Sequence, residues 1–263
     1  MGKWDALIKG ALLHDIGKVV YRANQGTDAH SKRGAAFIEP YFSDMGLKQS
    51  ITHCLKYHHG KELSSAQLKN DDYAYIVYEA DNIAAAVDRR DLDESTSTQK
   101  FDKELPLQSI FRVFGGKTST LPLQYYLRGI DVSNHFNYPE SDKTIRASSD
   151  KYKALYDVLV QNFQQQPIDN MSVNELLRIY EDTVSYMPSS TATDQANDIS
   201  LYMHSKITAA VAHSMVHYFE EQGIADYKEY CYQNSVTCQL LDSYLEIFLV
   251  SRILFIRFRL KVH

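Results

Sequence analysis

Residues 10–18 read GALLHDIGK, a short apolar pattern in which an imidazole, His14, and a carboxylate, Asp15, stand next to each other. Neighbouring residues of a helix project about 100° apart, so we expect these two side chains not to pair with each other as residues four apart do. Both can instead approach one small object from adjacent directions. Because imidazole and carboxylate together suit borderline transition metals, the stretch predicts ligands of a divalent metal ion.

The sequence on either side carries the apolar spacing of helices. Trp4, Leu7, Ile8, Ala11 and Leu12 follow the i, i+3, i+4 rule of a stripe that faces a core. The same spacing recurs in several later segments. We therefore expect a mainly α protein with helices over residues 4–22, 32–42, 47–59, 72–89, 151–165, 173–186 and 199–222.

The polarity of the chain changes between these helical segments. Residues 88–105 are charged and polar, and the runs up to residue 149 are broken by glycine and proline, as short strands or irregular loops are. Helical spacing then returns, and Ser172 followed by Glu175 is the pattern of a capping box. We expect a helical core at 1–90, a connector or insertion at 91–148, returning helices at 149–240 and an aberrant tail at 241–263.

Composition sets the broad class of the protein. The 263 residues are 44% hydrophobic and 23% charged, which is ordinary for a globular domain, and the formal charge of −5 gives the surface as a whole no attraction for nucleic acid. Cys54, Cys231 and Cys238 are odd in number and widely spaced, which favours reduced thiols. With no secretory signal pattern and no long apolar stretch, we expect a cytoplasmic protein without membrane contact.

More potential ligands follow the first pair along the chain. His30 begins HSKRGAAFI, His58 and His59 stand in KYHHGKE, and Asp81 lies in the apolar pattern YEADNIAAAV. Each alone has an ordinary explanation, because buried histidines are commonly hydrogen-bonded and Asp81 can pair with a basic residue. The combination is more specific than its parts. Two metal ions about 3.5–4 Å apart can clamp a phosphodiester during in-line attack.

The order of these residues resembles the HD phosphohydrolase superfamily, through LLHDIGK, the histidine of HSKRGA, YHHG and YEADNI. Members of that superfamily begin with a further histidine upstream of the HD pair, but only 13 residues precede His14. A matching helix occurs far downstream instead, in DISLYMHSKITAAVAHSMVHYF, where His204 is followed by small residues. The resemblance implies a circularly permuted HD-domain helical bundle with a small mixed insertion.

Within that superfamily, YHHG, EADNIAA, PLQSIF and SLYxHSKITAA resemble the large Csm-type subunit of type III-A CRISPR interference complexes. The resemblance implies a metal-dependent nuclease that cuts single-stranded DNA, with guide RNA and other complex subunits as partners. It also implies two palm domains, which this chain does not contain; after Leu249 the expected palm entry is replaced by SRILFIRFRLKVH. Met203 stands where the family has an aspartate, which weakens the expected metal support.

The resemblance also assigns roles to individual residues. His14, Asp15, Asp81 and His204 would hold one ion, and a second ion, bridged by Asp15, would be completed by His30, His58 and His59. Manganese or nickel is the expected metal. We predict that Lys18 contacts a phosphate oxygen, unless it is a solvated lysine at a helix end, and that Gly17 permits close packing or substrate approach.

Some alternatives stay open at the level of sequence. The same ligands would serve an HD-family nucleotide phosphohydrolase, and a degenerate HD module could act as a scaffold in a ribonucleoprotein complex. Two basic pairs, Arg89 with Arg90 and Lys32 with Arg33, are candidate nucleic-acid contacts or simply solvated charge. His53, His135 and His213 are expected in the core or on the surface, outside the metal site.

Overall fold

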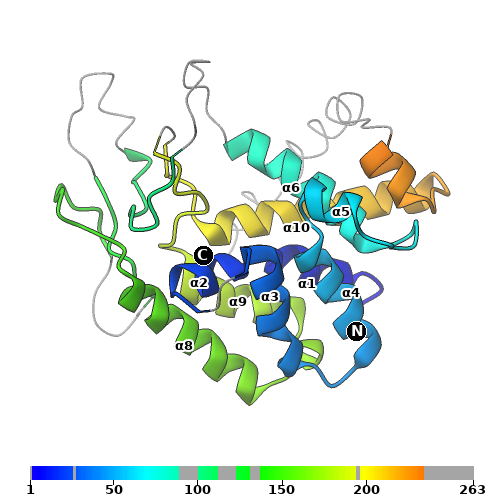
Figure 1. Cartoon of the computed structure of the whole chain (residues 1–263), viewed down its shortest axis with the longest axis horizontal. Coiled ribbons are helices and arrows are strands. Elements are labelled where there is room, and N and C mark those ends of the chain that lie inside the picture. The colour runs from blue at the N-terminus through cyan, green and yellow to red at the C-terminus, as the bar shows by residue number, and fades with distance from the viewer. Residues whose placement is uncertain are drawn as a thin grey trace, which may run out of the picture.

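The computed structural model describes residues 2–25, 28–88, 100–111, 123–130, 137–193 and 196–233, and it is predominantly helical as predicted (Figure 1). Arg89, Arg90, His135, Cys238 and the tail at 241–263 lie outside the described residues. The α-helices are α1 Asp5–Leu13, α2 Gly17–Arg22, α3 His30–Ile38, α4 Met45–Lys56, α5 Gly60–Ser64, α6 Tyr73–Asp88, α8 Ser149–Gln165, α9 Val173–Val184 and α10 Leu201–Glu221.

The single helix predicted over residues 4–22 is wrong, because the structure divides it into α1 and α2. Residues 14–16 form a turn in which the Ile16 N–H donates to the Leu13 carbonyl at 2.9 Å. The break allows α2 to change direction and pack against α3. Apolar spacing continues through the turn, with Ile16 and Val19 both fully buried, so periodicity alone gave no sign of the break.

Packing of the last long helix against the first ones sets the position of the site. α10 lies against both α1 and α6, and α1 also packs on α4 (Figure 1). Ala209 and Ala212 of α10 are small and buried, and a Cβ on Gly10 of α1 would lie 2.7 Å from the Cys54 sulfur of α4. The packing of α10 against α1 places the start of α10 beside the turn after α1, where His204 lies 3.6 Å from Asp15.

The ends of the helices are fixed by local chemistry. The predicted capping box is confirmed: the Ser172 hydroxyl accepts from the Glu175 N–H, and the Glu175 carboxylate accepts from the Ser172 N–H. Ser200 caps α10 in the same manner, accepting from the Met203 N–H. Between α4 and α5 the chain leaves helical geometry, since His59 has the extended backbone of an N-cap residue. This link carries two of the predicted ligands.

The connector, predicted to hold short strands or irregular loops, contains isolated bridges. Antiparallel bridges join Gln108 with Gln124 and Gln124 with Glu140, and no strand occurs in the part of the chain that the structure describes. Leu107 and Leu127 bury their side chains while neighbours such as Phe111 stay exposed. Single apolar residues of the connector are therefore buried in the core, and the described part of the segment does not form a continuous ladder of strand hydrogen bonds. None of the described helices is long and apolar enough to cross a bilayer.

A candidate metal centre of histidines and carboxylates

All of the predicted ligands come together at one point of the bundle, although they come from five different places in the chain. They lie in the α1–α2 turn, at the first residue of α3, in the α4–α5 link, on α6 and in the first turn of α10. The residues are His14, Asp15, His30, His58, His59, Asp81 and His204. Two separate metal-ligand groups are possible among them, His14–Asp15–His204 and His30–His58–His59.

Asp15 lies between these two groups, with one carboxylate oxygen directed at each. Its Oδ2 is 3.4 Å from Nε2 of His14 and 3.6 Å from Nε2 of His204. Its Oδ1 is 3.4 Å from Nε2 of His30 and 3.6 Å from Nε2 of His58. His14 and Asp15 thus reach the same centre from neighbouring directions, as the sequence predicted, and their side chains also approach each other there. The two oxygens of Asp15 face separate sets of imidazoles.

The other contacts complete each side. Asp81 Oδ1 lies 3.0 Å from Nε2 of His204 and 3.4 Å from Nε2 of His14, so it belongs to the Oδ2 side of Asp15. On the opposite side, Nε2 of His59 lies 2.9 Å from Nε2 of His30. Both sets direct Nε2 atoms or carboxylate oxygens inward. The centre thus separates into a His14–His204–Asp81 side and a His30–His58–His59 side, which Asp15 joins.

Backbone carbonyls fix which ring nitrogen faces the centre. Nδ1 of His14 donates to the Ala11 carbonyl at 2.7 Å, and Nδ1 of His58 donates to the Leu55 carbonyl at 2.6 Å. Because a carbonyl can only accept, Nε2 of each neutral ring carries its lone pair toward the centre. Nε2 of both rings and Oδ1 of Asp15 are fully buried without a hydrogen-bond partner. Buried polar atoms are rarely left unpaired, so these three atoms suit a metal ion.

The protonation states of the site also suit a cation. Burial opposes ionisation of Asp15, but Lys18 and His14 hold its pKa well below the usual range, and His14 does the same for Asp81. Burial and the neighbouring His59 lower the pKa of His58. Burial would also lower the pKa of His14, but the two carboxylates outweigh it and raise this pKa to about 10. Without a metal ion, a proton on His14 therefore balances part of the negative charge of Asp15 and Asp81, and this proton must leave before Nε2 can bind a metal ion.

Part of the centre is accessible to solvent. The side chains of His14 and His58 are fully buried, and Asp15 is 2% exposed. The His30 side chain is 26% exposed and His59 is also partly accessible, while Asp81 and Lys18 are partly exposed on the other side of the centre.

Several residues near the centre differ from what the sequence indicated. Lys18 is not a solvated helix-end lysine, because its ammonium lies 2.5 Å from Asp15 Oδ2; its contact with phosphate stays a prediction. A Cβ on Gly17 would lie 1.8 Å from the His30 carbonyl oxygen, so close packing is confirmed. Arg33 is buried and donates to the Gln25 carbonyl, so it forms no surface patch, whereas Lys32 is exposed.

One neighbour of the centre was missed from the sequence. Tyr180 on α9 is fully buried, and its pKa is raised by burial and by the charge of Asp15, with the Ser205 hydroxyl acting in the opposite direction. It lies on the apolar stripe of an amphipathic helix, so nothing in the local pattern marked it. Two other described histidines are outside the centre as expected: His53 pairs with Asp72 at 2.7 Å, and His213 contacts His217.

Comparison with known proteins agrees with this geometry. Residues 3–86 match the HD domain family model. This segment of the chain is therefore similar to an HD domain. His204 lies outside the matched residues, yet the fold brings it to the same centre.

The relatives identify which HD protein the chain is similar to. It is 38% identical over 239 residues to the "CRISPR system single-strand-specific deoxyribonuclease Cas10/Csm1 (subtype III-A)" of Enterococcus italicus, covering 87% of this chain and 31% of that protein. The protein of the same name from Streptococcus thermophilus is 34% identical over 228 residues, covering 85% of this chain and 29% of the relative. The chain thus spans under a third of the length of these curated relatives.

A solved structure gives the same result. The crystal structure of Csm1 from T. onnurineus matches with a TM-score of 0.60 and 25% identity, covering 81% of this chain and 28% of that one. The predicted resemblance to the HD-domain part of a Csm1-type large subunit is confirmed, and so is the helical HD fold.

Proposed function

We propose that this chain is a metal-dependent nuclease that hydrolyses phosphodiester bonds of single-stranded DNA within a type III-A CRISPR effector complex. The observation that carries the proposal is the position of Asp15, whose two oxygens face two separate sets of imidazoles. Relatives named single-strand-specific deoxyribonuclease support the substrate. Guide RNA and the other subunits of such a complex are the proposed partners, and the names of the relatives, which place them in subtype III-A CRISPR systems, support this proposal.

The residues present fit a pair of transition-metal ions. On one side His14, His204 and Asp81 offer two imidazoles and a carboxylate, and on the other His30, His58 and His59 offer three imidazoles. Nitrogen-rich sets of this kind suit manganese, nickel, iron or zinc better than magnesium or calcium. Manganese or nickel stays our proposed metal. When bound, such ions neutralise phosphate charge and make hydroxide available near neutral pH.

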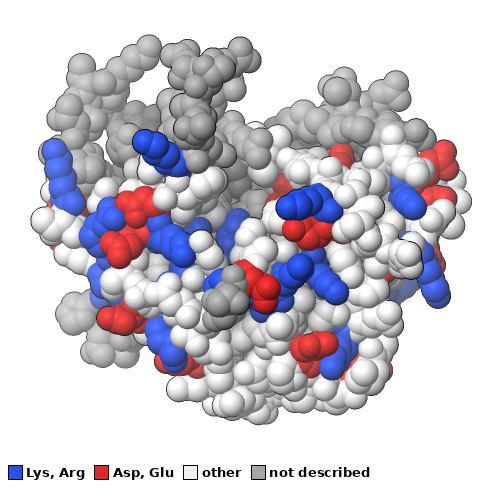
Figure 2. Space-filling view, in the orientation of Figure 1, with Lys and Arg blue, Asp and Glu red and all other residues white. Residues whose placement is uncertain are grey.

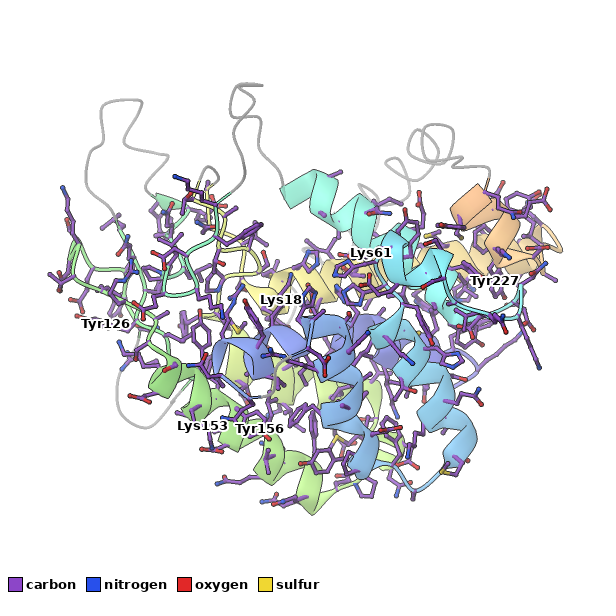
Figure 3. The ribbon with its side chains drawn as sticks, viewed as in Figure 1. Lys18, Lys61, Tyr126, Lys153, Tyr156 and Tyr227 are labelled. Atoms are coloured by element: carbon purple, nitrogen blue, oxygen red, sulfur yellow. The ribbon has the colours of Figure 1, made fainter. Side chains whose placement is uncertain are left out.

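The side chains of this chain have roles of their own in the proposed reaction. The His14 and His58 rings are held by backbone carbonyls, so their Nε2 atoms do not reorient as substrate arrives. Lys18 reaches the centre from α2, and Figure 3 shows it on the viewer's side of the bundle. Its single positive charge is partly exposed, and it is placed to pair with a phosphate oxygen that approaches Asp15.

The number of ions is a direct test, independent of activity. We expect two Mn²⁺ ions per chain after equilibrium dialysis, measured by elemental mass spectrometry. Asp81→Ala and His59→Ala each remove a ligand from one side, so each variant should retain one ion. Asp15→Ala removes the bridge and should retain neither. His217→Ala, at an exposed histidine outside the centre, is the matched control and should keep both. The bridged arrangement would be contradicted if the wild type bound a single ion and both Asp81→Ala and His59→Ala abolished its binding.

Activity separates the candidate functions. We expect the chain to cut a labelled single-stranded DNA with Mn²⁺ or Ni²⁺ but not with EDTA, and the His14→Ala/Asp15→Ala variant to be inactive. Release of phosphate from mononucleotides without strand cleavage would instead indicate a nucleotide phosphohydrolase. A folded chain that binds no metal would indicate a scaffold. The cytoplasmic location expected from the sequence stays a prediction.

A further inference from the structure

We propose that a groove between α3 and α4 binds the phosphodiester backbone of the single strand beside the metal centre. This inference rests on the proposed nuclease function and extends it to a binding track. The groove is open and has a volume of about 740 Å³. The charged residues along it include three lysines, Lys32 on α3 and Lys48 and Lys56 on α4.

Two contacts show that the groove runs toward the centre. Glu39, just after α3, pairs with Lys48 near the start of α4 at 4.0 Å. His30, the first residue of α3, contacts His59, which follows α4, at 2.9 Å. The two helices are therefore antiparallel, and the groove runs along them toward the helix ends that carry His30 and His59, although neither of these residues lines it. His30 and His59 are partly exposed there.

The lysines are arranged along this path. Lys48, Thr52 and Lys56 are spaced four residues apart, so they form one stripe on α4 that spans about 12 Å. This length is greater than the distance between neighbouring phosphates of a single strand, so the stripe can contact more than one phosphate. Lys32 lies across the groove, two residues from His30. Lys32 and Lys56 are exposed, and neither forms an ion pair with any residue that the structure describes.

The floor of the groove leaves room for a backbone. Ala35, Ala36 and Gly46 line it, and small side chains permit close approach. Packed helices lie only about 8–10 Å apart, so the space between them fits one strand better than a duplex. Figure 2 shows basic side chains gathered over this part of the face, with an acidic group beside them. Asp28 is an acidic residue that lines the groove, and it opposes binding of phosphate.

The test measures binding of the whole chain to a fluorescein-labelled strand of about 30 nucleotides by anisotropy in EDTA, from about 25 to about 200 mM NaCl. Each lost phosphate contact on a single strand lowers the salt slope by about 0.7, so Lys32→Ala/Lys56→Ala should lower it by about 1.4. The dissociation constant should rise about 10-fold near 100 mM salt. Asp28→Asn should have the opposite effect and tighten binding.

A control variant and a small substrate distinguish failure of the groove proposal from failure of the nuclease proposal. Lys151→Ala/Lys153→Ala removes two charges from α8, away from the groove (Figure 3), and should leave the affinity unchanged. Hydrolysis of bis(p-nitrophenyl) phosphate, which is too small to reach along the groove, should be equal in the groove variant and the wild type. An unchanged affinity and salt slope in the groove variant, or an equal loss in the α8 variant, would overturn the proposal. Failure of the wild type to hydrolyse the small diester would refute the nuclease instead.

Discussion

Replacing Gly17 by alanine tests the link between backbone packing and the metal centre. Gly17 begins α2, and an added Cβ would lie 1.8 Å from the His30 carbonyl oxygen and 2.7 Å from the Gly34 nitrogen. Both neighbours are backbone atoms of α3, so no side chain can rotate away. Contacts below 3.0 Å are not tolerated, and α3 must move by more than about 1 Å relative to α2.

The displacement has two measurable effects. Overpacking of this kind costs about 1–3 kcal/mol of the free energy of unfolding, or a melting temperature lower by roughly 4–8 °C for about 2 kcal/mol. His30 moves with α3, and it lies 3.4 Å from Asp15 and 2.9 Å from His59. A misplacement of about 1 Å can reduce turnover about 100-fold. The activity of the folded variant should therefore fall much more than the fraction of folded protein does.

Thermal and urea unfolding, together with Mn²⁺ stoichiometry, check this prediction. The matched control is Gly46→Ala, in the first turn of α4, where the added Cβ would meet only the Asp44 side chain at 3.3 Å. We expect the control to be as stable as the wild type or slightly more so, because alanine favours helix. A Gly17→Ala protein with wild-type stability and a full complement of ions would refute the close contact between α2 and α3.

Two further predictions concern parts of the fold away from the centre. Asp169 accepts hydrogen bonds from Ser43 and Asp44, and these donors outweigh burial and lower its pKa. The stabilisation by ionised Asp169 is complete above the pKa that this carboxyl has in the unfolded chain. It is lost as the pH falls through the lower pKa that the carboxyl has in the folded protein. In urea titrations, Asp169→Asn should therefore be less stable by about 1–3 kcal/mol at pH 7, with the difference vanishing in acid. A constant difference at all pH values would contradict it. Ser172→Ala breaks the capping box with Glu175 and should lower the free energy of unfolding by about 0.5–2 kcal/mol. Ser172→Asp should retain most of the wild-type stability, because aspartate also caps helices. Equal stability of the wild type and both variants would show that the cap contributes nothing.

The sequence by itself determined the helical class and the identity of the candidate ligands. Apolar spacing reports which face of a helix is buried, and this information is local, so α4, α6 and α10 were predicted close to their observed positions. The capping box before α9 was also local, because the serine and glutamate that form it are three residues apart. The ligand types were evident because histidine and aspartate in an apolar pattern need a partner.

Only the tertiary structure decided how these residues meet. Whether the helix breaks at residues 14–16 depends on α2 packing against α3, which apolar spacing does not record. His204 reaches Asp15 because α10 packs between α1 and α6, a contact between distant parts of the chain. The burial of Arg33, which removed it from the expected basic surface, also depends on neighbours distant in sequence or beyond a turn. Apolar periodicity specifies which face of each helix is buried, but which helix packs on that face follows from close packing of the whole bundle.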